Sequence, residues 1–417
     1  MKIGYACLTK AIPYTDFKGT IQKNATPDRL IEITTHNLQT LENILRYNVE
    51  DGLKMFRLSS DLIPFGSSPV NKTKWWDDLR PQWENLGRII KDNEIRVSMH
   101  PGQYTVLNSP DEDVVSRAVD DLVYHNLVLD SLGADNSAKI IIHIGGVYGD
   151  KKSAMDRFKE NYLKLPDSIK NRLIIENDDR SYRIEEVLDI GVHMGIPVVF
   201  DNLHHLVNGG GEDDSKWIEE AGKTWKERDG LQKIHYSQQN PERNPGAHSE
   251  TIDISALMDY IDKNIHHDLD IMLEVKDKNL SAKKGVNAIL DTGKIENLEK
   301  EWSRYKYNVL ERSPECYQEI RTLLKDKNSY PVREFYSLLD SAMYNAEPSQ
   351  GTVINGIEHV WGYFKDIATE KEILRFRKEL ERFKEGKLSL QALKNSLWRL
   401  TERYGEAYLS KSYYFHI

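Results

Sequence analysis

The sequence predicts an α/β fold, a (β/α)₈ barrel of the TIM type with a C-terminal helical extension. Two observations lead to this fold class. Short apolar runs alternate with helical patterns eight times over about 280 residues, and TIM barrels typically contain about 250 residues. Several of the runs are almost continuously apolar, as expected of parallel strands whose two faces are both buried.

The eight predicted strands each combine an apolar or β-branched run with a polar end. They are residues 2–7, 54–60, 95–100, 139–146, 172–178, 197–205, 232–237 and 270–276. A doubly wound open sheet is the alternative α/β architecture, but it gives no reason for eight similar units. It would also carry a glycine fingerprint after the first strand, and none is present.

Predicted helices fill the segments between the strands. In residues 37–49, one helical face is expected to carry Leu38, Leu41, Ile44, Leu45 and Val49. Residues 111–132 begin with acidic side chains, which suit the positive end of a helix dipole. Residues 183–194 and 255–265 show similar spacing.

The character of the sequence changes after about residue 300. Apolar residues recur at helical spacing from Leu374 to Leu400, without strand-like alternation. We therefore expect a barrel domain at residues 1–295 and a helical module at residues 296–417. The interleaved basic residues of the module are expected to form a solvated helix face. They are Arg375, Arg377, Lys378, Arg382, Lys384, Lys387 and Lys394.

Composition restricts the location and the partners of the protein. No apolar run approaches the roughly 18 residues of a membrane span, and the N-terminus lacks the apolar core of a signal peptide. Only two cysteines are present, far apart in the sequence. A disulfide framework is therefore excluded, and we expect a cytoplasmic protein. The net charge of −9 argues against nucleic acid, but bound cations would neutralise part of it.

Residues of metal-ligating types stand at the ends of six predicted strands. The carboxyl ends of barrel strands meet at one face, where catalytic groups gather. The residues there are His100, His143, Glu176, Asp201 with His204, His235 and Glu274, and His248 lies in the loop after the seventh strand. Without cations, so many charges and imidazoles at one barrel mouth would repel each other or remain unpaired.

A cluster of divalent ions explains this gathering. About seven to nine ligands are too many for one tetrahedral or octahedral site, so we expect two or three ions. Mixed imidazole and carboxylate ligands favour Mn²⁺ or Zn²⁺, with Mg²⁺ as a further alternative. In the structural alternative, the acids form ion pairs with basic residues nearby in the sequence, namely Arg172, Lys233 and Lys276.

Lys233 stands two residues before His235, so both side chains point to the same face of their strand. A lysine beside divalent cations is repelled, or its pKa is depressed. We hypothesise that Lys233 is neutral near the cluster, or carries a carboxylate modification that makes it a ligand. The alternative is a surface lysine.

A site with several ions favours hydrolysis of a phosphodiester. Ions a few ångströms apart activate a water molecule and stabilise both the attacking and the leaving oxygen. The sequence contains no P-loop, so a nucleotide cofactor is not expected. It also contains no Gly-x-Ser-x-Gly elbow, which argues against a serine hydrolase.

Eight motifs carry a resemblance to a known family. They are FRLSSDLIPF at 56–65, HPGQY at 100–104, HIGGVYGDK at 143–151, IENDD at 175–179, FDNLHH at 200–205, KIH at 233–235, PGAH at 245–248 and EVKDK at 274–278. With these motifs in this order, residues 1–290 closely resemble the UV damage endonuclease family. The resemblance implies a TIM barrel with a trinuclear site, usually active with Mn²⁺. It also implies nicking of damaged double-stranded DNA immediately 5′ to ultraviolet photoproducts and some other lesions, without ATP.

The resemblance also implies roles for individual residues. The metal ligands would be His100, His143, Glu176, Asp201, His204, His235, His248 and Glu274. Lys233 matches the family's modified lysine, and we take Glu176, His143 and Lys233 as the candidate catalytic residues. Ser68 stands where some members have a histidine ligand, and a serine hydroxyl is a poor ligand for these ions, so both two and three ions remain open.

DNA contacts are likewise implied by the resemblance. Gln103 and Tyr104 match residues that the family inserts into the duplex at the lesion, and Tyr5 is similar to another contact in that pocket. A planar side chain can fill the space left by flipped bases, and damaged bases are the easiest to unstack. On packing grounds alone, Tyr104 would instead be a loop aromatic on the barrel rim.

Three other functions remain open at this point. A sugar isomerase or epimerase would use similar strand-end residues with a proton-transfer pair. An abasic-site endonuclease would use related barrel chemistry. A lesion-binding module would hold closed, purely structural metal sites. We expect the protein to act as a monomer.

Overall fold

The computed structural model describes residues 1–211, 213–290 and 293–417. The chain divides into two compact units. The first contains Met1–Thr9 and Tyr14–Val286, and the second contains Lys10–Pro13 and Asn287–Ile417. Each unit is described separately below.

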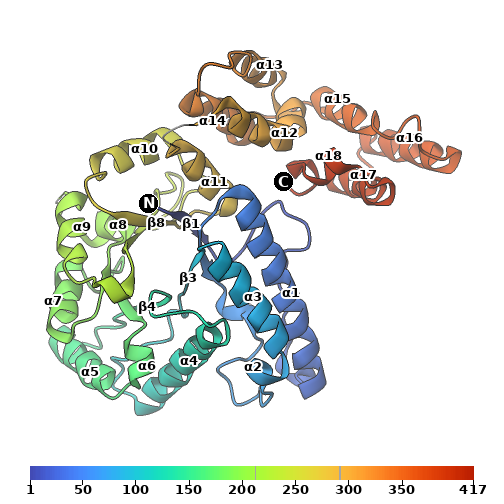
Figure 1. The fold of residues 1–417 in the computed structure, drawn as a ribbon. Helices are drawn as coiled ribbons and strands as arrows, with labels where there is room; N and C mark the ends of the chain where they lie inside the picture. Colours follow the sequence, from blue (N-terminus) through green and yellow to red (C-terminus); the bar gives the residue numbers. More distant parts are fainter. Residues whose placement is uncertain (212, 291–292) are drawn as a thin grey trace. The chain divides into compact units, whose positions relative to one another are not determined.

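The first unit is built around eight parallel strands, which confirms the predicted barrel (Figure 1). The strands are β1 (Ile3–Ala6), β2 (Met55–Leu58), β3 (Arg96–Met99), β4 (Lys139–His143), β5 (Leu173–Glu176), β6 (Val198–Val199), β7 (Gln232–Tyr236) and β8 (Leu269–Leu273). Their order is β6-β5-β4-β3-β2-β1-β8-β7. Each strand matches a predicted run, usually with one or two residues fewer at the ends.

The barrel closes between β6 and β7 through very few bonds. Asp201 and His235 form an isolated parallel bridge there, and the His235 amide donates to the Phe200 carbonyl at 2.9 Å. Strand β6 is two residues long, much shorter than the predicted run 197–205. The reason is local, since Asp201 accepts a hydrogen bond from the His204 amide and thereby starts helix α8 (Asn202–Asn208).

Helices cover the outside of the barrel (Figure 1). Besides α8, they are α1 (Pro27–Asp51), α2 (Trp75–Asp78), α3 (Arg80–Asp92), α4 (Glu112–Ser131), α5 (Lys151–Leu163), α6 (Asp167–Lys170), α7 (Ile184–Met194), α9 (Asp214–Gly222), α10 (Ile254–Lys263) and α11 (Asn279–Ala288). Short 3₁₀ turns lie at Gln22–Asn24, Ser60–Leu62 and Glu227–Asp229. The prediction was wrong for Val49, which is 40% exposed on α1.

All secondary-structure elements among the described residues of the second unit are helical. Its elements are α12 (Ile295–Arg312), α13 (Pro314–Leu323), α14 (Val332–Asp340), a π-helical turn (Ser341–Asn345), α15 (Gln350–Trp361), α16 (Glu370–Lys384), α17 (Leu390–Tyr404), α18 (Ala407–Ser410) and a 3₁₀ turn (Tyr413–Phe415). Most of its predicted basic face is exposed. Lys394 is the exception, because it is buried and donates to Glu311 at 2.9 Å.

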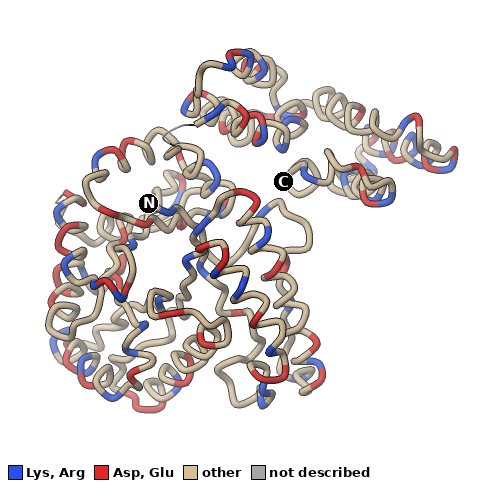
Figure 2. The backbone as a smooth tube through the Cα atoms, in the orientation of Figure 1, with Lys and Arg blue, Asp and Glu red and all other residues tan. Residues whose placement is uncertain are grey.

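Acidic and basic side chains alternate over the outer helices of the barrel (Figure 2). Among the described residues, no helix has the length and low charge content that a membrane crossing requires.

Candidate metal centre

Glu176 is the hub of the predicted ligands at the carboxyl end of the barrel. It ends strand β5 and is 1% exposed. Its Oε2 accepts a hydrogen bond from His100 Nε2 at 3.1 Å, and His143 Nε2 lies 4.0 Å from the same oxygen. Its Oε1 lies 2.8 Å from His235 Nδ1 and 3.5 Å from His204 Nδ1. One carboxylate therefore faces four imidazoles from four different elements.

Asp201 and His204 reach the cluster through the start of helix α8. The backbone groups of Asp201 bond to the side chain of Asn177, with Asp201 N donating to Oδ1 at 2.9 Å and Nδ2 donating to Asp201 O at 3.0 Å. His204 Nδ1 donates to the Asn177 carbonyl at 2.8 Å. This bond leaves His204 Nε2 as the nitrogen available to a metal, an arrangement that is usual for metal-binding histidines.

Glu274 forms an ion pair that the sequence did not reveal. It follows strand β8 and pairs with Arg57 of β2, while its Oε1 also lies 3.2 Å from His235 Nδ1. In the structural alternative, Arg172 and Lys276 would pair with acids of the cluster, and for these two residues it was wrong. Arg172 bonds to Asp130 and Lys276 pairs with Glu250. The sequence did contain one indication of the position of Arg57. Because side chains alternate along a strand, Arg57 lies on the opposite face of β2 from Phe56, which is the inner face of the barrel.

Two buried atoms of the cluster have no hydrogen-bond partner in the described part of the chain. They are Asp201 Oδ2 and His235 Nε2, on residues that are 0% exposed. Ligand atoms of Glu176, Asp201 and His235 lie within 4.8 Å of one another, as do those of His100, His143 and Glu176. Buried polar atoms normally have partners, so these residues fit bound cations, and the two groups can hold metal ions.

The charged groups of the cluster shift one another's pKa values. Burial raises the pKa of Asp201 to about 6 and lowers the pKa of His143 to about 4. Burial would also raise the pKa of Glu176, but His235 and His100 hold it well below its usual range. Burial opposes protonation of His204, yet Asp201 and Glu176 raise its pKa to about 9. A proton on His204 thus compensates part of the carboxylate charge.

Lys233 lies inside the barrel and is 1% exposed, so the surface alternative was wrong. On β7 it pairs in register with Asp270 of β8. Burial lowers the pKa of Lys233 well below its usual range, and the guanidinium groups of Arg96 and Arg57 lower it further. A lysine in this position is easily held neutral.

His248 and Ser68 lie in the loops that follow strands β7 and β2. His248 is half-buried in the loop after β7 and bridges to Gln239. Burial lowers the pKa of His248, with Glu274 and His204 among its charged neighbours. Ser68 is half-buried in the loop after β2, where its hydroxyl accepts from the Val70 amide at 3.3 Å.

The loop after β3 carries the two predicted lesion contacts on the surface. Gln103 is exposed, and Tyr104 is 70% exposed. The next residue, Thr105, is buried and donates a hydrogen bond to Asp121 Oδ2 of α4 at 2.6 Å. Helix α4 therefore anchors the loop directly behind its exposed aromatic ring.

Tyr5 is placed differently from the sequence-based expectation. Its ring is 0% exposed and lies 5.0 Å from the ring of Phe56. Its hydroxyl donates to Asn48 Oδ1 of α1 at 2.8 Å. Since side chains alternate along β1, Tyr5 faces the helix layer and offers no surface to DNA in this structure.

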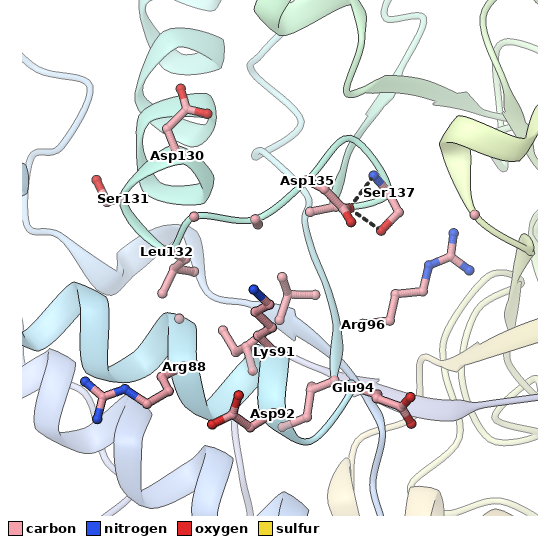
Figure 3. Close-up of a pocket in the computed structure, with 18 of the residues that line it drawn as sticks. Arg88, Lys91, Asp92, Glu94, Arg96, Asp130, Ser131, Leu132, Asp135 and Ser137 are labelled. Carbon is pink, nitrogen blue, oxygen red and sulfur yellow. Dashed lines mark hydrogen bonds between the residues drawn. The ribbon is translucent and has the colours of Figure 1, made fainter.

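A cavity of about 970 Å³ lies at the opposite end of the barrel, where the strands begin (Figure 3). Its lining includes Arg88, Lys91, Asp92, Glu94, Arg96, Asp130, Ser131, Leu132, Asp135 and Ser137. Arg96 donates to Asp270 at 2.8 Å, and Asp135 accepts from the amide and hydroxyl of Ser137. Catalytic groups of TIM barrels lie at the carboxyl ends of the strands, so the cluster around Glu176 is the candidate site.

Comparison with protein families divides the sequence in two. The family described as UV-endonuclease UvdE matches residues 2–306. The family described as a protein of unknown function (DUF1722) matches residues 306–417.

Similar proteins agree with the first match. A UV DNA damage endonuclease of Clostridium perfringens is 39% identical over 386 residues, covering 91% of this chain and 92% of its own length. One of Bacillus cereus is 35% identical over 274 residues, covering 65% of this chain and 86% of its own. The crystal structure of SacUVDE aligns with a TM-score of 0.66 and 39% identity, over 69% of this chain and 96% of that one.

Proposed function

Since this chain belongs to the UV-endonuclease family and is a DNA repair endonuclease that acts on UV lesions, we propose that it hydrolyses the phosphodiester immediately 5′ to the lesion. The reaction would take place at the cluster around Glu176. The observation that carries this proposal is a pair of buried atoms beside that carboxylate, Asp201 Oδ2 and His235 Nε2, which have no hydrogen-bond partner among the described residues.

We propose that the cluster binds two or three divalent ions, with Mn²⁺ preferred over Zn²⁺ and Mg²⁺. The proposed ligands are His100, His143, Glu176, Asp201, His204, His235, His248 and Glu274. When bound, such ions supply an activated water and stabilise charge on the phosphate oxygens.

The chain's own side chains orient and balance this site. The Asn177 carbonyl holds the His204 ring with Nε2 directed away from it, and Glu176 fixes the rings of His100 and His235. Arg57 neutralises part of the carboxylate charge at Glu274. We propose that Glu176, His143 and Lys233 lie nearest the reacting phosphate.

We propose that Lys233 is neutral or carries a carboxylate on Nζ. Its complete burial and the neighbouring Arg96 and Arg57 support a form without positive charge. Mass spectrometry under native conditions would detect a stable modification as added mass on the intact chain. The unmodified mass, together with full reactivity of Lys233 toward an acylating reagent, would contradict the modified form.

Lesion recognition is proposed to use Gln103 and Tyr104. Both are exposed at the same end of the barrel as the cluster, and an aromatic ring can stack where damaged bases have been displaced. We further propose a monomer without a nucleotide cofactor that acts in the cytoplasm. Its endonuclease domain would span residues 1–295, with a helical module at 296–417.

The proposal is tested with an irradiated duplex oligonucleotide. We expect strand cleavage with Mn²⁺ and none with a chelator, and the cut should map to the bond 5′ to a single thymine dimer. An abasic duplex and an undamaged duplex serve as comparison substrates. Absence of metal-dependent cleavage of the irradiated strand would contradict the proposed chemistry.

A further inference from the structure

A strained turn on the barrel rim carries an exposed tyrosine that the site described above does not use. The turn Val147–Asp150 follows β4, and the Asp150 amide donates to the Val147 carbonyl at 3.0 Å. Its two central residues both have positive φ, 48° at Tyr148 and 81° at Gly149. This is the arrangement of a type I′ turn, in which Asn-Gly is preferred. A bulky side chain at the first central position is disfavoured, and such strain is often retained at functional sites.

The Tyr148 ring is held outward by its neighbours. It is 46% exposed, and a Cβ atom added at Gly146 would lie 3.1 Å from the ring. The guanidinium carbon of Arg157 lies 5.6 Å from the ring centre, and Arg157 Nε donates to the Asn108 carbonyl at 2.9 Å. A cation and a phenol are thus fixed side by side.

The acid that ends the turn, Asp150, is bound by the start of helix α5. Asp150 caps α5, and its carboxylate accepts hydrogen bonds from the Lys152 and Ser153 amides and from the Ser153 hydroxyl. The positive end of the helix dipole stabilises its charge there. The Tyr148 hydroxyl and the Arg157 guanidinium therefore remain available to an anionic partner.

The turn lies beside the loop that carries Tyr104. Asn108 Nδ2 of that loop donates to the Gly146 carbonyl at 2.7 Å, and β3 and β4 are neighbouring strands. Both exposed rings therefore follow adjacent strands at the same end of the barrel. Tyr148 is one strand further round the rim from the proposed lesion pocket.

We propose that Tyr148 and Arg157 form a second DNA contact, which binds the sugar–phosphate backbone of the duplex beside the lesion. This inference rests on the proposed docking of DNA at the carboxyl end of the barrel. The phenol donates to a phosphate oxygen, and the guanidinium supplies positive charge next to it. Contacts of this kind position a protein on DNA without reading the bases, so the pair raises affinity for damaged and undamaged duplex alike.

The test uses Tyr148→Asn, which removes the ring but suits the turn. We expect an unchanged or higher thermal midpoint, because Asn tolerates positive φ. Binding should weaken roughly ten- to a hundredfold, the worth of one hydrogen bond to a charged group. The loss should be equal for an undamaged duplex and for a lesion duplex with a non-hydrolysable bond 5′ to the lesion. Arg157→Gln should make the plot of the logarithm of the binding constant against the logarithm of the salt concentration less steep, by about 0.9.

Leu231→Asn is the matched control, since Leu231 is 43% exposed at the opposite end of the barrel. Unchanged binding of both duplexes by Tyr148→Asn would overturn the inference. A loss confined to the lesion duplex would also overturn it, because Tyr148 would then belong to the lesion pocket. Other results would contradict the proposed function rather than this inference. They are no nicking of an irradiated duplex by the unmodified enzyme, or unchanged discrimination between damaged and undamaged duplex by Tyr104→Ala.

Discussion

A single carboxylate organises the candidate metal centre, and its two oxygens face different imidazoles. Glu176→Gln would replace one charged acceptor with an amide nitrogen that has no lone pair to offer. We expect nicking to be abolished and bound metal to decrease, while the fold and lesion binding persist. Metal content per chain, circular dichroism and cleavage of an irradiated plasmid measure these effects. Glu250→Gln, at a rim acid that pairs with Lys276, is the control, and full activity of Glu176→Gln would contradict the role.

The exposed ring of Tyr104 is the second residue with a measurable role. Tyr104→Ala should reduce the discrimination between damaged and undamaged duplex by about 1–3 kcal/mol, the usual worth of one base–aromatic stack. Binding of undamaged DNA should change little. Competition binding with the two duplexes gives this difference directly. Equal weakening for both duplexes would assign the ring to general affinity instead.

Sequence reasoning located side chains better than it located their partners. The histidines and acids at the strand ends followed from alternating strand patterns, because a barrel brings those ends together. Arg57 was missed because its pairing with Glu274 joins strands that are far apart in the sequence. Tyr148 was missed because a positive φ is a property of the backbone, and a tyrosine in the sequence gives no indication of it. The buried position of Tyr5 was not foreseen, because a motif carries no information on the face of the strand on which a side chain lies.

Helix α4 anchors the loop after β3, and this gives a prediction at the scale of an element. Thr105→Val keeps the shape of the side chain but removes the hydroxyl that bonds to Asp121. The loop should then hold Tyr104 less firmly, with a loss of about 0.5–1.5 kcal/mol in lesion discrimination. Thr105→Ser keeps the hydroxyl and should behave like the unmodified enzyme. Identical discrimination by the two variants would show that the bond does not position the ring.

Helices α12 and α17 of the second unit are joined by a buried ion pair. Lys394→Met would leave Glu311, which is 2% exposed, as an unpaired buried charge, and should destabilise the fold by about 3–5 kcal/mol. Adding Glu311→Leu should recover most of that loss. Urea unfolding of the full chain measures both effects. Lys384→Met, at an exposed pair with Glu381, should cost about 0–1 kcal/mol; a loss as large as that of Lys394→Met would contradict the burial argument.

Element boundaries depended on capping groups that the hydrophobic pattern does not contain. The apolar run after residue 197 predicted a long sixth strand. The chain instead enters α8 because the Asp201 side chain binds the His204 amide. The same aspartate is both a helix cap and a candidate ligand, and only the first role changes the secondary structure.

For the whole molecule, the repeated pattern of eight units was sufficient to predict the barrel. It could not show how the circle is completed, since that depends on individual bonds between the sixth and seventh strands. The helical character of the second unit followed from its spacing. The Lys394–Glu311 pair did not, because a basic residue on an amphipathic helix normally remains in solvent.

The sparse contact between β6 and β7 implies that a bound metal ion would have a structural role as well as a catalytic one. Asp201 and His235, which form the bridge between these strands, are also candidate ligands. An ion bound by both residues would therefore cross-link the two strands and stabilise the closed barrel. At 100-fold excess over its dissociation constant, a ligand stabilises the native state by about 2.7 kcal/mol. We expect hydrogen exchange to slow on addition of Mn²⁺ most strongly at the His235 amide, and equal slowing in all strands would contradict this. The metal-bound enzyme would then be more rigid than the metal-free one. In the metal-free protein, the first local opening would occur between β6 and β7, at the active site.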